Sequence, residues 1–200
     1  MQLDHQDKSR LGKFFARALR DYGINNPKAV RWEEPRDQRA RFETLCEIGD
    51  LAGRSILDVG CGLGDLYPFL ESRFRNFTYL GIDLLPEMVA AARQKYPGGQ
   101  FEVADVYSVR HKFDYVLASG ALSFNVAPGK KFYFDMIARM FELCNKGLAF
   151  NMLDSDYYSA DRDFLVYNPQ ELIPVAERLT PNFQIIVGYT VGDFTVYLYR

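Results

Sequence analysis

The sequence has few cysteines, no long apolar run and almost no net charge, and each absence excludes a class of protein. The three cysteines, Cys46, Cys61 and Cys144, are odd in number and far apart, which argues against a disulfide framework and against a metal site. No uncharged apolar run approaches the roughly 18 residues of a membrane span, and the polar N-terminus lacks the apolar core of a signal peptide. We therefore expect a cytoplasmic protein with reduced thiols, no membrane partner and no metal.

The two signs of charge are nearly balanced. The chain has 24 basic and 26 acidic side chains, a net charge of −2, so no overall field would attract it to nucleic acid. With 48% hydrophobic residues over 200 positions, the chain can bury one sizeable core, and we expect a single domain over residues 1–200. Nothing in the pattern indicates an oligomeric state.

The first 53 residues are predicted to be mainly helical. Apolar residues recur at helical spacing over residues 8–22, opposite a basic face, and Gly23 ends the pattern. A basic amphipathic helix can lie on a membrane, but we expect this one to dock on its own domain. A second helix is predicted from Pro35 to Asp50, because proline suits a first helical turn. Residues 1–53 should then form a helical lid on a core of residues 54–200.

From Arg54 onward the pattern is that of an α/β protein. Short apolar runs alternate with helical stretches, over residues 55–59, 64–74, 77–83, 86–96, 100–105, 113–119, 128–143 and 147–153. This alternation indicates a doubly wound, mostly parallel sheet with helices on both faces. A capped helix is predicted from Asn168 to about Arg178. Two β-rich runs, 183–189 and 194–199, are joined by so short a turn that they must form an antiparallel hairpin. The prediction is seven strands in all.

A glycine-rich loop leaves the first strand. In Asp58-Val59-Gly60-Cys61-Gly62-Leu63-Gly64 the glycines allow a sharp turn and close approach of a ligand to the backbone. The second strand ends at Asp83, where a carboxylate can accept hydrogen bonds from both hydroxyls of a ribose, or can merely cap the next helix. Cys61 is expected to be a small residue tolerated in the loop and not a nucleophile.

The loop favours S-adenosylmethionine (SAM) over a nicotinamide dinucleotide. The dinucleotide fingerprint places a third small residue five positions after the first glycine, but here that position is Asp65. An aspartate in the first helical turn opposes a pyrophosphate, which relies on bare N–H groups and the positive end of the helix dipole. SAM has no phosphate and carries a positive sulfonium, so the carboxylate of Asp58 at the end of the first strand suits it.

Together these motifs resemble the class I SAM-dependent methyltransferases. The resemblance rests on the spaced glycines 60, 62 and 64, on Asp83, on Ala104-Asp105-Val106 after the third strand and on the closing hairpin, and it covers residues 54–200. It implies strand order 3-2-1-4-5-7-6 with the last strand antiparallel, and N-terminal helices over the carboxyl rim of the sheet. It also implies contacts of Gly60, Cys61 and Gly62 with the methionine part of SAM, of Asp83 with the ribose, and of Asp105 and Val106 with the adenine. Ser119 would lie beneath the cofactor, and Leu84, next to Asp83, is also expected to bind it.

The catalytic group is harder to predict than the cofactor site. His111 precedes the fourth strand and should lie at the opposite rim, so a histidine base is not expected. Asp154, after the fifth strand, is the candidate base, with a turn cap as the alternative. Arg41 is the candidate for the SAM carboxylate, because a guanidinium fork matches that group.

The predicted function is transfer of a methyl group from SAM to a small polar or aromatic acceptor. The Asn/Asp-Pro-Pro-Tyr signature of amino methylation on bases or glutamine is absent after the fourth strand, where the chain reads Ser119-Gly120-Ala121-Leu122. Three alternatives stay open at this point. They are a non-catalytic SAM-binding module, a methyltransferase that acts on protein or RNA, and a dehydrogenase.

Overall fold

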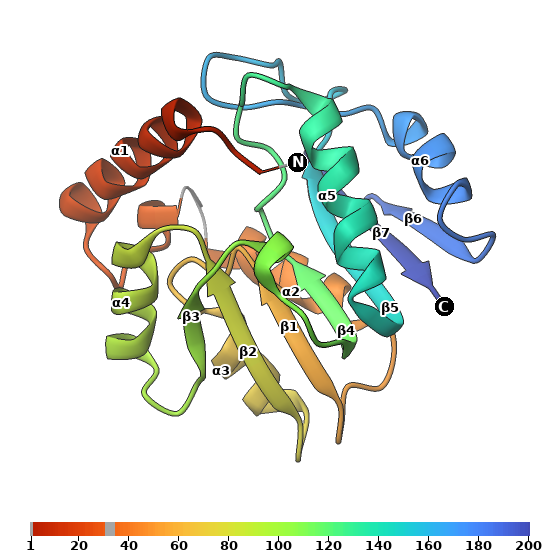
Figure 1. Ribbon diagram of the computed structural model, residues 1–200, viewed down its shortest axis with the longest axis horizontal. Helices are drawn as coiled ribbons and strands as arrows, with labels where there is room; N and C mark the ends of the chain where they lie inside the picture. The colour runs from red at the N-terminus through yellow and green to blue at the C-terminus, as the bar shows by residue number, and fades with distance from the viewer. Residues whose placement is uncertain (1, 31–34) are drawn as a thin grey trace.

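The computed structural model describes residues 2–30 and 35–200, and one seven-stranded sheet runs through its centre (Figure 1). Its order is β3-β2-β1-β4-β5-β7-β6. The strands are β1 (Ser55–Val59), β2 (Thr78–Asp83), β3 (Phe101–Val103), β4 (Phe113–Ala118), β5 (Cys144–Leu153), β6 (Phe183–Val187) and β7 (Asp193–Tyr199). The first five are parallel, and β7 is antiparallel to both of its neighbours. The predicted strand order and closing hairpin are confirmed.

Helices cover both faces of the sheet. They are α1 (His5–Tyr22), α2 (Pro35–Cys46), α3 (Leu66–Arg73), α4 (Pro86–Lys95), α5 (Lys130–Glu142) and α6 (Ile173–Glu177), with short 3₁₀ turns η1 (Pro27–Val30), η2 (Val106–Ser108) and η3 (Pro169–Leu172). One apolar core joins the sheet to α5 and α6, and a second joins its other face to α2, α3 and α4. Burial on both faces explains why the parallel strands are continuous apolar runs in the sequence.

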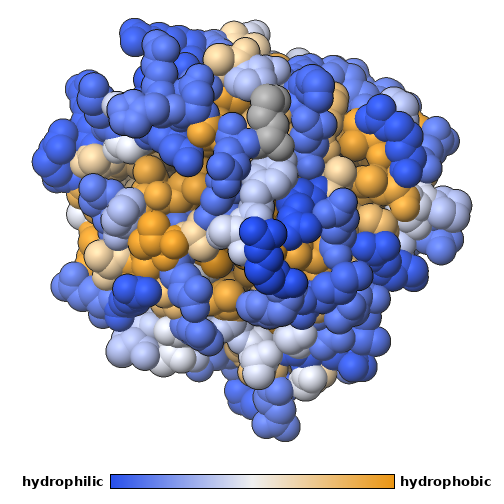
Figure 2. All heavy atoms as spheres, viewed as in Figure 1, coloured by the Kyte–Doolittle hydropathy of each residue, from blue (hydrophilic) through white to orange (hydrophobic). Residues whose placement is uncertain are grey.

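Helix α1 lies across the carboxyl end of the sheet, above α4 (Figure 1). Its apolar side chains Leu11, Phe15 and Leu19 pack against a small core that includes Leu85 and Met88 at the start of α4. Figure 2 shows hydrophobic surface among hydrophilic side chains on this side of the molecule. The helix thus covers the rim where parallel α/β sheets bind ligands.

Several element boundaries differ from the sequence prediction for local reasons. Helix α1 begins at His5 because the carboxylate of Asp4 accepts the Asp7 N–H at 2.7 Å and caps it. Helix α5 begins at Lys130 and not at Pro128, because Gly129 has φ of +62° and cannot be helical. The cap at Asn168 is a full capping box with Glu171, as the sequence predicted.

Within the described residues, no helix has the length and apolarity required to cross a membrane. In the same part of the chain, no group of three histidine, cysteine or acidic side chains is placed to hold a metal ion. All three cysteines are buried free thiols.

Candidate functional site

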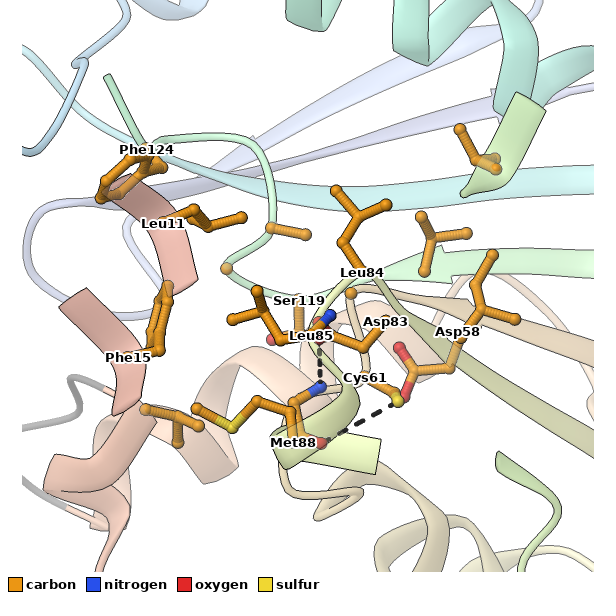
Figure 3. A pocket seen from close by; sticks show the side chains of 18 of the residues that line it. Leu11, Phe15, Asp58, Cys61, Asp83, Leu84, Leu85, Met88, Ser119 and Phe124 are labelled. Atoms are coloured by element: carbon orange, nitrogen blue, oxygen red, sulfur yellow. Dashed lines mark hydrogen bonds between the residues drawn. The ribbon is translucent and has the colours of Figure 1, made fainter. Parts of the chain in front are cut away.

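A cleft opens where β1, β2 and β4 end beneath α1. Its empty space, with the solvent at its open mouth included, is about 1290 Å³. Figure 3 shows the side chains of Asp58, Asp83 and Ser119 gathered on one side, with Leu11 and Phe15 of α1 facing them. The cleft therefore has a polar wall from the sheet and an apolar wall from the N-terminal helix.

The glycine loop forms the floor of the cleft between β1 and α3. Gly60, Gly62 and Gly64 have φ values of +74°, +53° and +78°, a region that other residues rarely adopt. A Cβ on Gly60 would also lie 2.5 Å from the Cβ of Ala121. The amides of Gly60 and Cys61 both donate to the carbonyl of Ile82, at 2.8 and 3.0 Å. These two hydrogen bonds hold the loop against the end of β2. The positive φ values and the close approach to Ala121 explain why glycine is needed in the loop.

Asp83, the last residue of β2, holds the loop from the other side. Its carboxylate accepts the Gly62 N–H at 3.0 Å and the Leu85 N–H at 2.9 Å, one on each oxygen. Burial raises the pKa of Asp83, and the two backbone hydrogen bonds oppose that rise. Each carboxylate oxygen has two lone pairs, so each can accept a further hydrogen bond from the cleft. The side chain therefore closes the turn that leads to Leu85, the N-cap residue of α4, but it does not cap the helix itself. It can still accept from a ligand diol.

Asp58 is a buried carboxyl group at the end of β1. It is 2% exposed, and its Oδ2 accepts a hydrogen bond of 2.7 Å from the Tyr79 hydroxyl. Burial raises the pKa of Asp58 to about 7. Sequence reasoning missed Tyr79, although alternation along β2 places its side chain on the same face as that of Asp83. A cation in the cleft would favour the ionised form of Asp58.

The remaining predicted cofactor residues, apart from Arg41, also line the cleft. Leu84, Asp105, Val106 and Ser119 are all part of its wall. Asp105 accepts the Tyr107 N–H at 3.1 Å and so caps η2. The Ser119 Oγ is buried, and within the described chain it has no hydrogen-bond partner. The sequence prediction thus gathered one set of residues that the fold does place together.

Two side chains near the glycines, those of Cys61 and Asp65, are held in one state by their surroundings. Cys61 lines the cleft, and burial raises the pKa of its thiol far above the ordinary value, so the thiol stays protonated. This agrees with the expectation that it is not a nucleophile. Asp65, at the start of α3, accepts hydrogen bonds from Lys95 Nζ at 2.6 Å and from the Tyr96 hydroxyl at 2.7 Å. Its charge is therefore partly neutralised on the outer side of the cleft.

Arg41 and Asp154 lie outside the lining of the cleft. The guanidinium of Arg41, only 5% exposed, forms a buried ion pair with Asp193 at the start of β7, with Nε 2.6 Å from Oδ2. Arg41 thus has a protein carboxylate as its partner, and it is not among the residues that line the cleft. Asp154 Oδ1 accepts the Asp156 N–H at 2.9 Å, which is the turn cap considered as its alternative role. Both side chains therefore have partners within the protein, and the roles expected of them toward a ligand stay predictions.

An aromatic and aliphatic wall, which the sequence did not reveal, encloses the other side of the cleft. Its members are Leu3, Leu11, Phe15, Phe124, Val126, Phe132, Met136 and Phe164. They come from α1 and the residue Leu3 before it, from the loop after β4, from α5 and from the loop after β5. Only the helical spacing of the residues on α1 was visible in the sequence, because the other contacts join distant segments.

Two polar side chains hold α1 in place over the cleft. Asp7 is 3% exposed and accepts the Ala127 N–H at 2.8 Å. Arg10 donates to the carbonyl of Asn125 at 2.8 Å and to that of Arg162 at 3.1 Å. Its guanidinium also lies 5.1 Å from the centre of the Phe124 ring. Helix α1 is thereby joined to both loops that contribute to the apolar wall.

Comparison with known proteins identifies relatives that share this architecture. A family model described as a methyltransferase domain matches residues 56–147. A putative methyltransferase from Mycobacterium tuberculosis is 30% identical over 151 residues, which cover 71% of this chain and 90% of that protein. A trans-aconitate 2-methyltransferase from Methylobacterium nodulans is 37% identical over 75 residues, covering 36% of this chain and only 29% of that protein.

A solved structure extends the likeness to the whole fold. Magnesium protoporphyrin IX methyltransferase from Synechocystis, determined with bound SAM, superposes with a TM-score of 0.71 over 100% of both chains. The two sequences are 17% identical, so this match concerns the fold.

Proposed function

Because this chain belongs to the class I SAM-dependent methyltransferases, we propose that it transfers the methyl group of SAM to a small molecule held in the cleft beneath α1. The observation that carries the proposal is the pairing of a carboxylate-bearing wall with an apolar wall in one enclosed space. Such a space suits a neutral or cationic acceptor of low molecular mass. The relative named for trans-aconitate acts on a tricarboxylate, for which this lining offers a less suitable environment.

We assign SAM to the polar wall. Asp83 would accept from the ribose hydroxyls, and Leu84, Asp105 and Val106 would bound the adenine. Asp58 and the backbone from Gly60 to Gly62 would lie beside the positively charged methionine part. The donor set fits this molecule, because buried carboxyls favour a cation and the unpartnered Ser119 Oγ can bond to a polar ligand.

Methyl transfer makes modest chemical demands on the protein. The sulfonium of SAM supplies an activated methyl group. The acceptor atom donates a lone pair to the methyl carbon while the carbon–sulfur bond breaks, its electron pair going to sulfur, and the proton released from the acceptor passes to water. The protein residues must align the acceptor with that carbon and exclude other water, which the apolar wall and α1 are suited to do. Neither Arg41 nor Asp154 is required in this scheme.

The cofactor assignment is tested by calorimetry with SAM. Replacing Asp83 with alanine removes a charge-assisted contact worth about 1.5–3 kcal/mol, so SAM affinity should fall about 10- to 150-fold. Glu102→Gln, at an exposed position on the neighbouring strand, is the control and should bind SAM as the wild type does. Equal affinity of the Asp83 variant and the wild type would contradict the assignment. NAD should show no saturable binding.

The acceptor class is tested with methyl-labelled SAM. We expect label to appear in a low-molecular-mass metabolite fraction and not in protein or RNA fractions. Label in protein or RNA would overturn the small-molecule proposal. SAM binding without turnover in any fraction would instead indicate a non-catalytic SAM-binding module.

A further inference from the structure

Polar side chains form a row where β4 and β5 end and the antiparallel β7 begins. In the β5–β7 register, Asn151 pairs with Thr195 and Leu153 pairs with Asp193. The β4–β5 register ends at Ala118 and Phe150, and one further step places Ser119 opposite Asn151. Because alternate residues of a strand share a face, Ser119, Asn151 and the two β7 side chains lie on the same face of the sheet. This is the face that α2 covers.

Three oxygen atoms in this row are buried and have no hydrogen-bond partner anywhere in the described chain. They are Ser119 Oγ, Asn151 Oδ1 and Asp193 Oδ1. Asn151 is 1% exposed and Asp193 is 4% exposed. The amide of Asn151 is oriented by its Nδ2, which donates to Thr195 Oγ1 at 2.7 Å, and Thr195 in turn donates to the Tyr189 hydroxyl at 2.9 Å. The Oδ1 of Asn151 is therefore left as an acceptor without a donor in the described chain.

Unpartnered buried acceptors are rare because each loses its bonds to water on folding. Two of them within one short stretch of the β5–β7 ladder call for a donor that bears at least two hydrogens. A primary amide and an ammonium group each bear at least two N–H donors, whereas a hydroxyl bears only one, and the local charge distinguishes between the first two.

Carboxylates outnumber cations around the row. Arg41 forms the ion pair with one oxygen of Asp193, while Asp37 and Asp154 both act on Asp193 through space. Tyr158 and Tyr189 are the other titratable groups beside this pair. The pKa of Asp193 is raised, to about 6, by burial above all, which is the effect that a bound cation would relieve.

The row meets the cleft at Ser119, which belongs to both, whereas Asn151 and Asp193 are not among the residues that line it. Gln38 and Phe42 of α2 line the cleft on either side of Arg41 in the sequence. We propose that Asn151 and Asp193, with Ser119 at the cleft end, form a subsite for the ammonium group of an amine-bearing acceptor. This inference rests on the proposed function, because it deepens that function by naming the acceptor's chemical class.

The test uses three ligands that share an aromatic ring and differ in head group. Benzylamine, benzyl alcohol and benzoate are titrated by NMR into protein saturated with S-adenosylhomocysteine, the product form of the cofactor. We expect benzylamine to bind at least about tenfold more tightly than benzoate, as loss of charged hydrogen bonds predicts. Benzyl alcohol should lie between them.

The variants assign the effect to the row. Asn151→Leu keeps the number and branching of the side-chain heavy atoms and removes the acceptor, so benzylamine affinity should fall at least about tenfold while S-adenosylhomocysteine affinity is unchanged. Asn145→Leu makes the same substitution at an exposed position near the other end of β5, and it should change neither. Asn151→Asp retains acceptor oxygens and should retain benzylamine binding, which keeps the test decisive if the leucine variant does not fold.

The outcomes separate this inference from the function on which it rests. If the wild type fails to bind S-adenosylhomocysteine, the proposed function fails. If it binds S-adenosylhomocysteine but prefers benzoate, or binds none of the three ligands, the ammonium subsite is refuted. Unchanged benzylamine affinity in Asn151→Leu would also refute it and would mean that the oxygen faces a buried water.

Discussion

Replacing the buried Asp58 with asparagine should stabilise the free protein at alkaline pH. The carboxyl group is 2% exposed, and burial raises its pKa from 3.8 to about 7. Between these two pH values the folded state holds a proton that the unfolded state has lost, so stability falls as pH rises through this window. A tenfold change in the acid constant is worth 1.36 kcal/mol, and the whole rise corresponds to about 4 kcal/mol. The free energy of unfolding is lowered by this full amount only above pH 7, where the buried carboxylate is charged in the folded protein.

Asparagine removes the titration but not the contact. Its side-chain oxygen can still accept from the Tyr79 hydroxyl, which bonds Asp58 Oδ2 at 2.7 Å. The amide N–H groups bring their own burial cost, but that cost does not depend on pH. The effect of the substitution on the free energy of unfolding should therefore become more favourable by about 4 kcal/mol between pH 4 and pH 8.

Urea unfolding of both proteins at pH 4 and pH 8 measures this difference. Glu102→Gln, an exposed carboxylate replaced in the same way, shows how much of the pH dependence is general. If the effect of Asp58→Asn differs by less than about 1 kcal/mol between the two pH values, the reasoning about Asp58 is refuted. The same variant should bind SAM more weakly than the wild type, because the cationic ligand loses a carboxylate partner.

The other predictions concern the loop, the candidate base and the lid. Gly60→Ala should destabilise the protein by about 1–3 kcal/mol more than Gly53→Ala, because both glycines have positive φ but only a Cβ at position 60 would press against Ala121. Urea unfolding measures both variants, and equal losses of unfolding free energy would exclude that contact as the cause. Asp154→Asn should lower the saturated methyl-transfer rate less than tenfold, since its carboxylate caps a turn; a fall of about 10²–10⁴ would instead mark it as a base. Removing residues 1–30 should leave a folded core with weaker SAM or acceptor binding by calorimetry, and undiminished affinity would show that the segment is not a lid.

The features that the sequence predicted well are those set by local chain chemistry. Alternating apolar runs predicted the strands, because each strand had to be buried on both faces. The glycine loop and Asp83 were found because a sharp turn after a strand needs glycine at fixed positions. The capping box at Asn168 and Glu171 was found for the same reason, since both partners lie within one turn. The strand order came from the family resemblance and not from any local pattern.

The features that it missed depend on contacts between distant segments. Arg41 and Asp193 are 152 positions apart, and Asp7 and Ala127 are 120 apart, so no spacing in the sequence relates them. Arg41 was assigned to a ligand because its chemistry suits any carboxylate, and the fold supplies one from its own hairpin. The apolar wall escaped notice because its aromatics are indistinguishable in sequence from core residues.

The docked position of α1 couples the accessibility of the N-terminus to events in the cleft. Leu3, Leu11 and Phe15 form part of the cleft wall, so that wall exists only while the helix is in place. On the outer surface of the same helix, Lys13 and Arg17 are exposed and are sites at which trypsin cuts an unfolded segment. Any ligand that contacts the wall must lower the population of undocked helix by mass action. The rate at which trypsin removes the N-terminal segment is consequently a direct readout of how much of the protein is occupied.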